Sequence, residues 1–219
     1  MIKNQLIFLG PPGCGKGTQT ERLSKELKLP HIDTGSLLRA EIAANSEYGK
    51  IAKSYIDKGH LVPPELAADV ILKKILSDDC KNGYILDGFP RSIQQADIFE
   101  KVLEENNLND KTSRAVIKMM INRDFLMNRL VNRRLCKGCS AIYNLKTNPP
   151  KAEGICDICG SELYQRSDDR EDVAIERFDT YNKETAPLVN YYEKKKLLYY
   201  VDSNADIEEV HKRILNAIK

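Results

Sequence analysis

The fold is set by a short stretch near the amino terminus, Gly10-Pro11-Pro12-Gly13-Cys14-Gly15-Lys16-Gly17-Thr18. It directly follows the apolar run Gln5–Leu9 and opens a segment with helical spacing, Thr18–Leu27. Glycines at such a strand–helix junction let successive backbone N–H groups turn inward, at the positive end of a helix. With the ammonium group of Lys16 beside it, the loop predicts a site for the phosphates of a nucleotide. A glycine- and proline-rich surface turn is the alternative interpretation.

Strand-like and helix-like segments alternate along the rest of the chain. Further strands are predicted at Gly83–Leu86, Ala115–Met120 and Leu197–Val201, and further helices at Pro64–Leu76, Gln94–Glu104 and Ile207–Ile218. Continuous apolar runs are typical of strands buried on both faces, and their alternation with helices favours a parallel sheet covered on both sides. The predicted fold class is therefore α/β.

Two stretches interrupt this alternation. Residues 34–62 are predicted to form short helices, whereas residues 136–169 are rich in Cys, Gly, Pro and Asn and poor in long apolar runs. Because neither stretch continues the order of strands and helices, both are interpreted as insertions into the α/β core.

The composition limits the class of protein. The chain has 219 residues, of which 42% are apolar and 30% charged, as in a globular domain with an insertion or two. Lys and Arg number 34 against 32 Asp and Glu, and this balance argues against a protein that grips long polyanions. No apolar run approaches the roughly 18 residues of a membrane span, and residues 1–10 lack the features of a signal peptide. We therefore expect a cytoplasmic protein with no membrane partner.

Four of the six cysteines form two C-x-x-C pairs separated by 16 residues, Cys136 with Cys139 and Cys156 with Cys159. This spacing suits a Zn²⁺ ion held by four thiolates, and such a site is structural because no coordination position stays open. Two disulfides or an accidental cluster are the alternatives. Disulfides fit a cytoplasmic protein poorly.

A zinc-ribbon nucleic-acid-binding protein with an ATPase core is a different hypothesis for the same features. Between the first and last of the four cysteines, the basic residues are Lys137, Lys146 and Lys151, against the acidic Glu153 and Asp157. So small a positive excess is too little for a surface that tracks phosphates. We therefore expect no nucleic-acid partner.

Further motifs follow the phosphate loop. The first is Asp33-Thr34-Gly35-Ser36-Leu37-Leu38-Arg39, and the second is Asp87-Gly88-Phe89-Pro90-Arg91, with Gln95 four residues later. Arginines then gather at Arg129, Arg133, Arg166 and Arg177. Guanidinium groups suit phosphate dianions because their planar fork can donate two parallel hydrogen bonds. Asp87, at the carboxyl end of a strand beside the phosphate loop, is placed to hold the water shell of Mg²⁺.

In these motifs, in the Gly-Lys-Gly-Thr end of the loop and in the four cysteines, the chain resembles the adenylate kinase family of nucleoside monophosphate kinases. The resemblance is to the bacterial long form with a zinc-binding lid, and it runs from Gln5 to Ile218. It implies a five-stranded parallel sheet. Because the sequence shows no exposed apolar heptad or stripe that would indicate a protein partner, we expect a monomer. The implied parts are a core of residues 1–33, 63–131 and 170–219, an AMP-binding insertion of residues 34–62, and a lid of residues 132–169.

The implied reaction is the reversible transfer of the terminal phosphoryl group of MgATP to AMP, which gives two ADP. The acceptor is a phosphate whose second pKa is about 6, so it is mostly ionised and needs no general base. Positioning and electrostatic stabilisation by cations carry the reaction instead. Gln95 is the main reason to expect AMP, since an amide can hydrogen-bond an adenine edge. A sister kinase that accepts another nucleoside monophosphate is the alternative.

The resemblance also assigns individual residues. On the ATP side it places Gly13, Cys14, Gly15, Lys16, Gly17, Thr18, Arg129, Arg133, Ile142, Tyr143 and the backbone near Ala205. Around AMP it places Thr34, Arg39, His60, Leu61, Val62, Gly88, Phe89, Pro90, Arg91, Gln95, Arg166 and Arg177. The residues implied in catalysis are Lys16, Asp87, Arg91, Arg129, Arg133, Arg166 and Arg177. Two positions depart from the family pattern, because Asn144 stands where a histidine is common and Thr147 where an aromatic residue is common.

Overall fold

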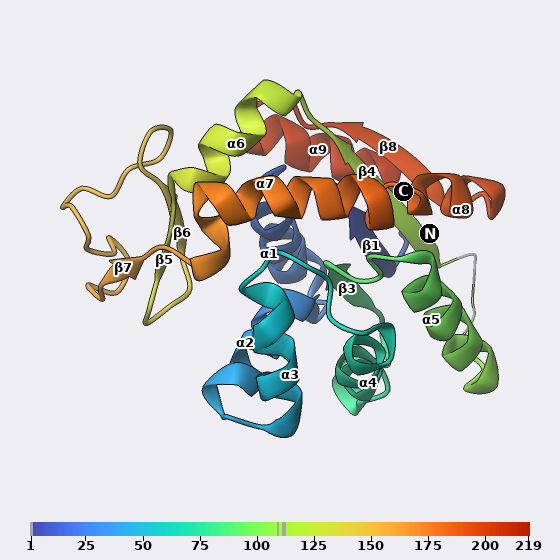
Figure 1. Ribbon diagram of the computed structural model, residues 1–219. Coiled ribbons are helices and arrows are strands. Elements are labelled where there is room, and N and C mark those ends of the chain that lie inside the picture. Colours follow the sequence, from blue (N-terminus) through green and yellow to red (C-terminus); the bar gives the residue numbers. More distant parts are fainter. Residues whose placement is uncertain (1, 109, 111–112) are drawn as a thin grey trace.

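The structure is a computed structural model that describes residues 2–108, 110 and 113–219. A sheet of five parallel strands, in the order β2-β3-β1-β4-β8, forms its centre (Figure 1). The strands are β1 (Gln5–Leu9), β2 (His31–Asp33), β3 (Tyr84–Asp87), β4 (Arg114–Met120) and β8 (Leu198–Asp202). The predicted α/β class and the parallel five-stranded sheet are confirmed.

Helices cover both faces of the sheet, because successive side chains of a strand point to opposite faces. On β1, Ile7 and Leu9 pack with apolar residues of α4, α5 and α8, whereas Leu6 and Phe8 pack with those of α1, α6 and α9. These four side chains are at most 2% exposed. Within the described residues, no helix has the length and apolar character of a membrane span. The helices around the sheet are α1 (Lys16–Leu27), α4 (Pro64–Ile75), α5 (Ile93–Glu105), α6 (Arg123–Val131), α7 (Glu171–Thr180), α8 (Leu188–Lys194) and α9 (Ile207–Ala217).

The predicted strands and helices are found within one or two residues of their predicted ends. Gly83 was expected to open a strand, but it lies in the turn before β3. Its φ is +120°, and a Cβ atom there would lie 2.2 Å from the carbonyl oxygen of Asn4. The short strand β2 has no counterpart among the predicted ranges, because Ile32 is its one buried apolar residue.

The strand order creates a crevice at the carboxyl edge of the sheet. The chain leaves β1 toward β2 and β3 on one side and later crosses to β4 on the other. At such a switch point the loops diverge, and ligands bind between them. The phosphate loop follows β1, Thr34 follows β2 and Gly88 follows β3, so three predicted motifs meet at this edge.

The two insertions project from this core (Figure 1). The first contains α2 (Thr34–Ala43) and α3 (Glu47–Ile56), which pack so closely that a Cβ on Gly49 would lie 2.1 Å from the carbonyl oxygen of Glu41. The second is a small antiparallel sheet in the order β6-β5-β7. Its strands are β5 (Arg133–Cys136), β6 (Ile142–Asn144) and β7 (Leu163–Tyr164). The order of strands and helices is therefore interrupted where the sequence predicts it.

Phe99 provides a test of the core. Its side chain is 0% exposed, and its ring meets Phe89 edge to face with 5.8 Å between the centroids. We expect Phe99→Ala to lower the free energy of unfolding by about 3–5 kcal/mol, because it leaves a cavity between α5 and the sheet. Leu76→Ala, at a position that is 48% exposed, should change it by less than about 0.5 kcal/mol. Urea titrations followed by circular dichroism measure both, and equal losses would contradict this packing.

Candidate active site

The loop between β1 and α1 has the backbone of a phosphate cradle. Gly13 and Gly15 have φ values of 80° and 95°, which glycine adopts without steric penalty. A Cβ on Gly13 would also lie 3.1 Å from the carbonyl oxygen of Leu126. Gly15 is the N-cap of α1, where unpaired backbone N–H groups and the helix dipole attract an anion. Cys14 is 2% exposed, so its thiol packs against the protein interior, and its backbone N–H donates a hydrogen bond to the carbonyl oxygen of Pro11 at 3.3 Å.

Lys16 begins α1, and its side chain folds back over the loop. The ammonium group donates hydrogen bonds to the carbonyl oxygens of Gly10 at 2.7 Å and Pro11 at 3.1 Å. It also lies 3.6 Å from the sulfur of Cys14. The two carbonyl oxygens carry no full negative charge, so a phosphate can replace them as partners of the ammonium group.

Asp87 ends β3 beside this loop. Its Oδ2 accepts a hydrogen bond from the hydroxyl of Thr20 at 3.4 Å and lies 3.7 Å from Nε2 of His31. Burial alone would raise the pKa of Asp87, but the contact with His31 and the charge of Lys16 outweigh it and lower the pKa. The side chain is therefore an ionised carboxylate, which suits the water shell of a hard cation.

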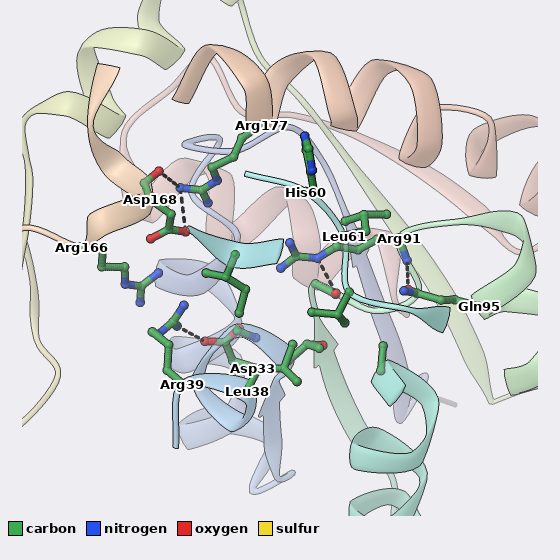
Figure 2. Close-up of a pocket in the computed structure, with 16 residues that line it drawn as sticks. Asp33, Leu38, Arg39, His60, Leu61, Arg91, Gln95, Arg166, Asp168 and Arg177 are labelled. Atoms are coloured by element: carbon green, nitrogen blue, oxygen red, sulfur yellow. Dashed lines mark hydrogen bonds and ion pairs between the residues drawn. The ribbon is translucent and has the colours of Figure 1, made fainter. Parts of the chain in front are cut away.

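A pocket lies between α2, the segment before α4 and the loop after β3 (Figure 2). It brings together most of the residues predicted around AMP, namely Thr34, Arg39, His60, Leu61, Val62, Gly88, Arg91, Gln95, Arg166 and Arg177. Phe89 is not among them, because its side chain is 0% exposed and packs in the core.

A second hollow joins this pocket to the phosphate loop. Gly10, Pro12 and Lys16 line it on the loop side. Arg91 and Arg177 belong to its lining as well as to that of the pocket, and so do Leu61 and Gly88. Pro90, the remaining residue predicted around AMP, also lines this hollow. Two anions, one in the loop and one in the pocket, would therefore face each other across shared arginines.

The arginines occupy one end of the pocket. Arg39, Arg166 and Arg177 gather there, Gln95 lies at the opposite end, and Arg91 lies between them (Figure 2). Within the described residues, the buried Nε of Arg166 has no acceptor. Burial and the charge of Arg39 lower the pKa of Arg166 to about 10. A buried donor without a partner is unfavourable in the free protein, so this end of the pocket favours an anionic ligand.

Arg39 is positioned by the start of α2. Asp33 is the N-cap of this helix, since its carboxylate accepts hydrogen bonds from the backbone N–H groups of Gly35 at 3.0 Å and Ser36 at 3.1 Å. Oδ2 of Asp33 also lies 3.4 Å from Nη2 of Arg39. A Cβ on Gly35 would lie 2.9 Å from this guanidinium group, so the glycine lets Arg39 fold back along the helix.

Two adjacent carboxylates hold the arginines on the lid side. Asp169 is 0% exposed and accepts hydrogen bonds from both Arg133 and Arg177. Nε of Arg133 lies 2.8 Å from Oδ2 of Asp169, and Nη1 of Arg177 lies 2.8 Å from Oδ1. Asp168 lies 3.1 Å from Arg177. Burial alone would raise the pKa of Asp168, but the charges of Arg177 and Arg166 outweigh it and lower the pKa.

Gln95 forms the opposite end of the pocket and is 2% exposed. Ser92 caps α5 by accepting a hydrogen bond from the backbone N–H of Gln95 at 3.2 Å. Oε1 of Gln95 accepts a hydrogen bond from the backbone N–H of Arg91 at 2.7 Å. The side-chain NH₂ is therefore the group left for a ligand, since Oε1 already accepts a hydrogen bond from the protein.

The four cysteines of the two C-x-x-C pairs come together in the lid, with their sulfur atoms within 4.8 Å of one another. The sulfur of Cys136 lies 3.3 Å from that of Cys159, and the sulfur of Cys139 lies 3.6 Å from that of Cys156. All four are free thiols, so the alternative of two disulfides does not describe this structure. The backbone N–H group of Gly138 points at the sulfur of Cys136 at 3.3 Å, as in a site built for thiolates.

Comparison of the sequence with known proteins agrees with this geometry. A family model described as adenylate kinase matches residues 8–197. The chain belongs to the adenylate kinase family. The adenylate kinase of Archaeoglobus fulgidus is 47% identical over 209 residues, which cover 95% of each chain. That of Caldanaerobacter subterraneus subsp. tengcongensis is 45% identical over 214 residues, or 98% of this chain and 96% of the relative. That of Carboxydothermus hydrogenoformans is 46% identical over 215 residues, or 98% and 99%.

The lid residues that the adenylate kinase pattern assigns to ATP have different surroundings. A side-chain carbon of Ile142 would lie 3.7 Å from a Cβ on Gly17, so Ile142 borders the phosphate loop. Tyr143 is 6% exposed, and its hydroxyl lies 3.5 Å from the sulfur of Cys156 and accepts a hydrogen bond from the backbone N–H of Asp157. Its side chain therefore belongs to the interior of the lid, and a contact with ATP would fall to its backbone.

Arg129 and Ala205, also assigned to ATP, do not line either hollow. The carbonyl oxygen of Arg129 accepts a hydrogen bond from the side-chain NH₂ of Asn144 at 3.1 Å. Oδ1 of Asn144 accepts from the backbone N–H groups of Lys146 at 3.0 Å and Thr147 at 3.1 Å. Asn144 thus closes a turn and ties the lid to α6, and the ATP contacts of Arg129 and Ala205 stay predictions.

Sequence reasoning assigned no role to the carboxylates that organise the site, Asp33, Asp168 and Asp169. The sequence could have indicated these carboxylates, because each lies within a few residues of an arginine that is predicted to bind phosphate. In this member of the adenylate kinase family, the acids keep several guanidinium groups near one another in a partly buried place, where like charges would otherwise repel.

Asp169 tests this arrangement. We expect Asp169→Asn to lower the free energy of unfolding by about 3 kcal/mol, because it leaves Arg133 and Arg177 without their shared buried carboxylate. The amide keeps the size of the side chain and removes its charge. Asp172→Asn is the matched control, since the side chain of Asp172 is 74% exposed. Chemical denaturation of both variants measures the difference, and an unchanged stability for Asp169→Asn would contradict the role of the carboxylate.

Proposed function

We propose that this protein is an adenylate kinase that transfers the terminal phosphoryl group of MgATP to AMP and gives two ADP, reversibly. The observation that carries the proposal is the pair of adjoining hollows with shared arginines. One hollow contains the phosphate loop with Lys16, the other has a cationic end and an amide end, and Arg91 and Arg177 line both. Two phosphate groups held in this way would meet at one place.

AMP is the acceptor that the pocket favours. Its phosphate would lie at the end formed by Arg39, Arg166 and Arg177, and its base at the end formed by Gln95 (Figure 2). The NH₂ group of Gln95 can donate a hydrogen bond to N1 of adenine, which is an acceptor. N1 of guanine carries a hydrogen and would face this donor unfavourably. The amide therefore favours adenine over guanine.

The donor nucleotide would bind with its phosphates in the loop of residues 13–18. The Mg²⁺ ion of the nucleotide would be held through its water shell by Asp87 and the hydroxyl of Thr18. The ion would neutralise negative charge on the transferring phosphates. Arg133 would contact the same phosphates from the lid side. Each of these groups positions or neutralises charge, and none needs to accept a proton, because the attacking oxygen belongs to an ionised phosphate.

We also propose that the insertions of residues 34–62 and 132–169 close over the two nucleotides, with residues 1–33, 63–131 and 170–219 as the core. Two contacts that cross between these parts support the proposal. The hydroxyl of Ser167 lies 3.2 Å from Asp57, and Nε2 of His60 lies 3.1 Å from Glu176. Closure would exclude water that could otherwise accept the phosphoryl group.

A structural Zn²⁺ in the lid fits the four cysteines. Zn–S bonds of about 2.3 Å in a tetrahedron imply sulfur–sulfur distances of about 3.8 Å, near those found here. The hydrogen bond from the hydroxyl of Tyr143 lowers the pKa of the Cys156 thiol to about 6, which favours the thiolate that a metal needs. The ion would replace a hydrophobic core that the small lid lacks.

Acceptor specificity tests the proposed reaction. With MgATP as donor, we expect a coupled assay to give a kcat/KM for AMP at least about 100-fold above that for GMP, CMP or UMP. Gln95→Leu should raise the KM for AMP by about 10-fold, because it removes the donor to the base. The variant should leave the KM for ATP nearly unchanged. A preference for another monophosphate would replace this proposal with that of a sister kinase.

Metal analysis tests the lid. We expect about one equivalent of zinc in protein purified without chelators, and a loss of most of it in Cys156→Ser, since three thiolates cannot complete the tetrahedral site. Cys80→Ser is the matched control, because it removes a thiol outside the lid and should keep the zinc. Removing the metal should lower the melting temperature of the wild type. Purified wild type with no zinc, or full zinc in Cys156→Ser, would contradict the assignment.

A further inference from the structure

Lys118 lies beside the phosphate loop but belongs to none of the predicted motifs. It stands on β4 in register with Leu9, the last residue of β1 before the loop begins. Its side chain is half-buried, and its ammonium group donates a hydrogen bond to the hydroxyl of Tyr181 at 2.5 Å. The ammonium lies 5.1 Å from the centroid of the same ring, so it sits beyond the hydroxyl rather than over the face. The contact is therefore a hydrogen bond between strand β4 and the turn that follows α7.

In the described part of the chain, no carboxylate lies close enough to Lys118 to pair with it, and its hydrogen bond goes to Tyr181. Burial lowers the pKa of Lys118, the nearby Cys14 raises it, and the positive charge of Lys16 lowers it further. A partly desolvated ammonium group without a counter-ion is unfavourable, and a second ammonium nearby adds to the penalty. The free protein thus holds two like charges, Lys16 and Lys118, at one side of the phosphate loop.

Tyr181 cannot supply the missing negative charge. Burial raises the pKa of its phenol, so the hydroxyl stays protonated and offers Lys118 a neutral oxygen. Tyr181 opens a short π-helical turn, Tyr181–Thr185, one helical turn after Arg177. It lines the same hollow as Lys16 and Arg177. π-Helical turns often occur at functional sites, and this one brings the phenol to the loop.

We propose that Lys118 is a further determinant of nucleotide binding, whose ammonium group is neutralised by the phosphates of the donor nucleotide and is held in place by Tyr181. Lys118 lines neither hollow, so it acts through its charge at a distance and is not a catalytic residue. The inference rests on the proposed function only for the identity of the ligand, MgATP. It predicts opposite effects of the charge in the two states, because the ammonium destabilises the empty protein and stabilises the complex.

Lys118→Met separates these effects, since methionine keeps an unbranched side chain and removes the charge. We expect calorimetry to show MgATP binding weakened by about 5- to 20-fold, with AMP binding changed by less than about 2-fold. The melting temperature of the nucleotide-free protein should stay equal or rise. Lys118→Arg should restore most of the affinity, because it restores the charge. Lys25→Met is the control for net charge, since the side chain of Lys25 is 76% exposed on α1.

Tyr181→Phe tests the positioning of the ammonium group. It removes one hydroxyl, so it should weaken MgATP binding less than Lys118→Met does, and the two effects should not add in the double variant. A purely structural Lys118 would show the reverse pattern, with a lower melting temperature and unchanged MgATP affinity, and that result would overturn the inference. Weaker MgATP binding in Lys25→Met by the same factor would overturn it as well. Phosphoryl transfer by the wild type is assayed separately, so a failed activity assay rejects the proposed function and leaves the binding comparison intact.

Discussion

Guanidinium groups repel one another, and the site depends on keeping several of them together in a partly buried pocket. Carboxylates make this possible. Asp169 bridges Arg133 and Arg177 from a fully buried position, and Asp33 contacts Arg39 from the cap of α2. Among the residues that the structure describes, the buried Nε of Arg166 has no such partner. The arrangement therefore fixes most of the cations before a ligand arrives and leaves part of their hydrogen-bonding capacity unused, as preorganised electrostatic stabilisation requires.

The parallel sheet determines where these charges meet. Its central strand β1 leads into the phosphate loop, β2 leads into α2 with Arg39, and β3 ends at Asp87 before the loop with Arg91. These three strands are neighbours, so their carboxyl ends bring residues that are far apart in sequence to one edge. The buried side chains of β1 hold that edge rigidly, because helices pack on both faces. Apolar packing thereby supports a site made of polar groups.

Local patterns predicted the parts of the molecule that depend on local interactions. The phosphate loop, the strand and helix ranges and the paired cysteines could be recognised from the sequence, because spacing and residue type decide them. Most residues of the pocket came instead from the resemblance to the family. Partners across the fold could not. That Asp169 joins Arg133 to Arg177, that Tyr143 serves the lid interior, and that Lys118 meets Tyr181 follow from the packing of distant elements. The free amide group of Gln95 likewise depends on one backbone hydrogen bond, which no spacing reveals.

The lid links the cysteine cluster to the arginines along two strands. Arg133 and Cys136 stand at opposite ends of β5, and β7 precedes Arg166 by two residues. The apolar interior of the lid consists of few buried side chains, including Tyr143 and Leu163 beside the sulfur atoms. So small an interior cannot by itself hold two strands in a fixed register. The four-sulfur cluster therefore affects the geometry of the active site. A group that joins the four sulfur atoms also fixes the strands β5 and β7, and with them the positions of Arg133 and Arg166.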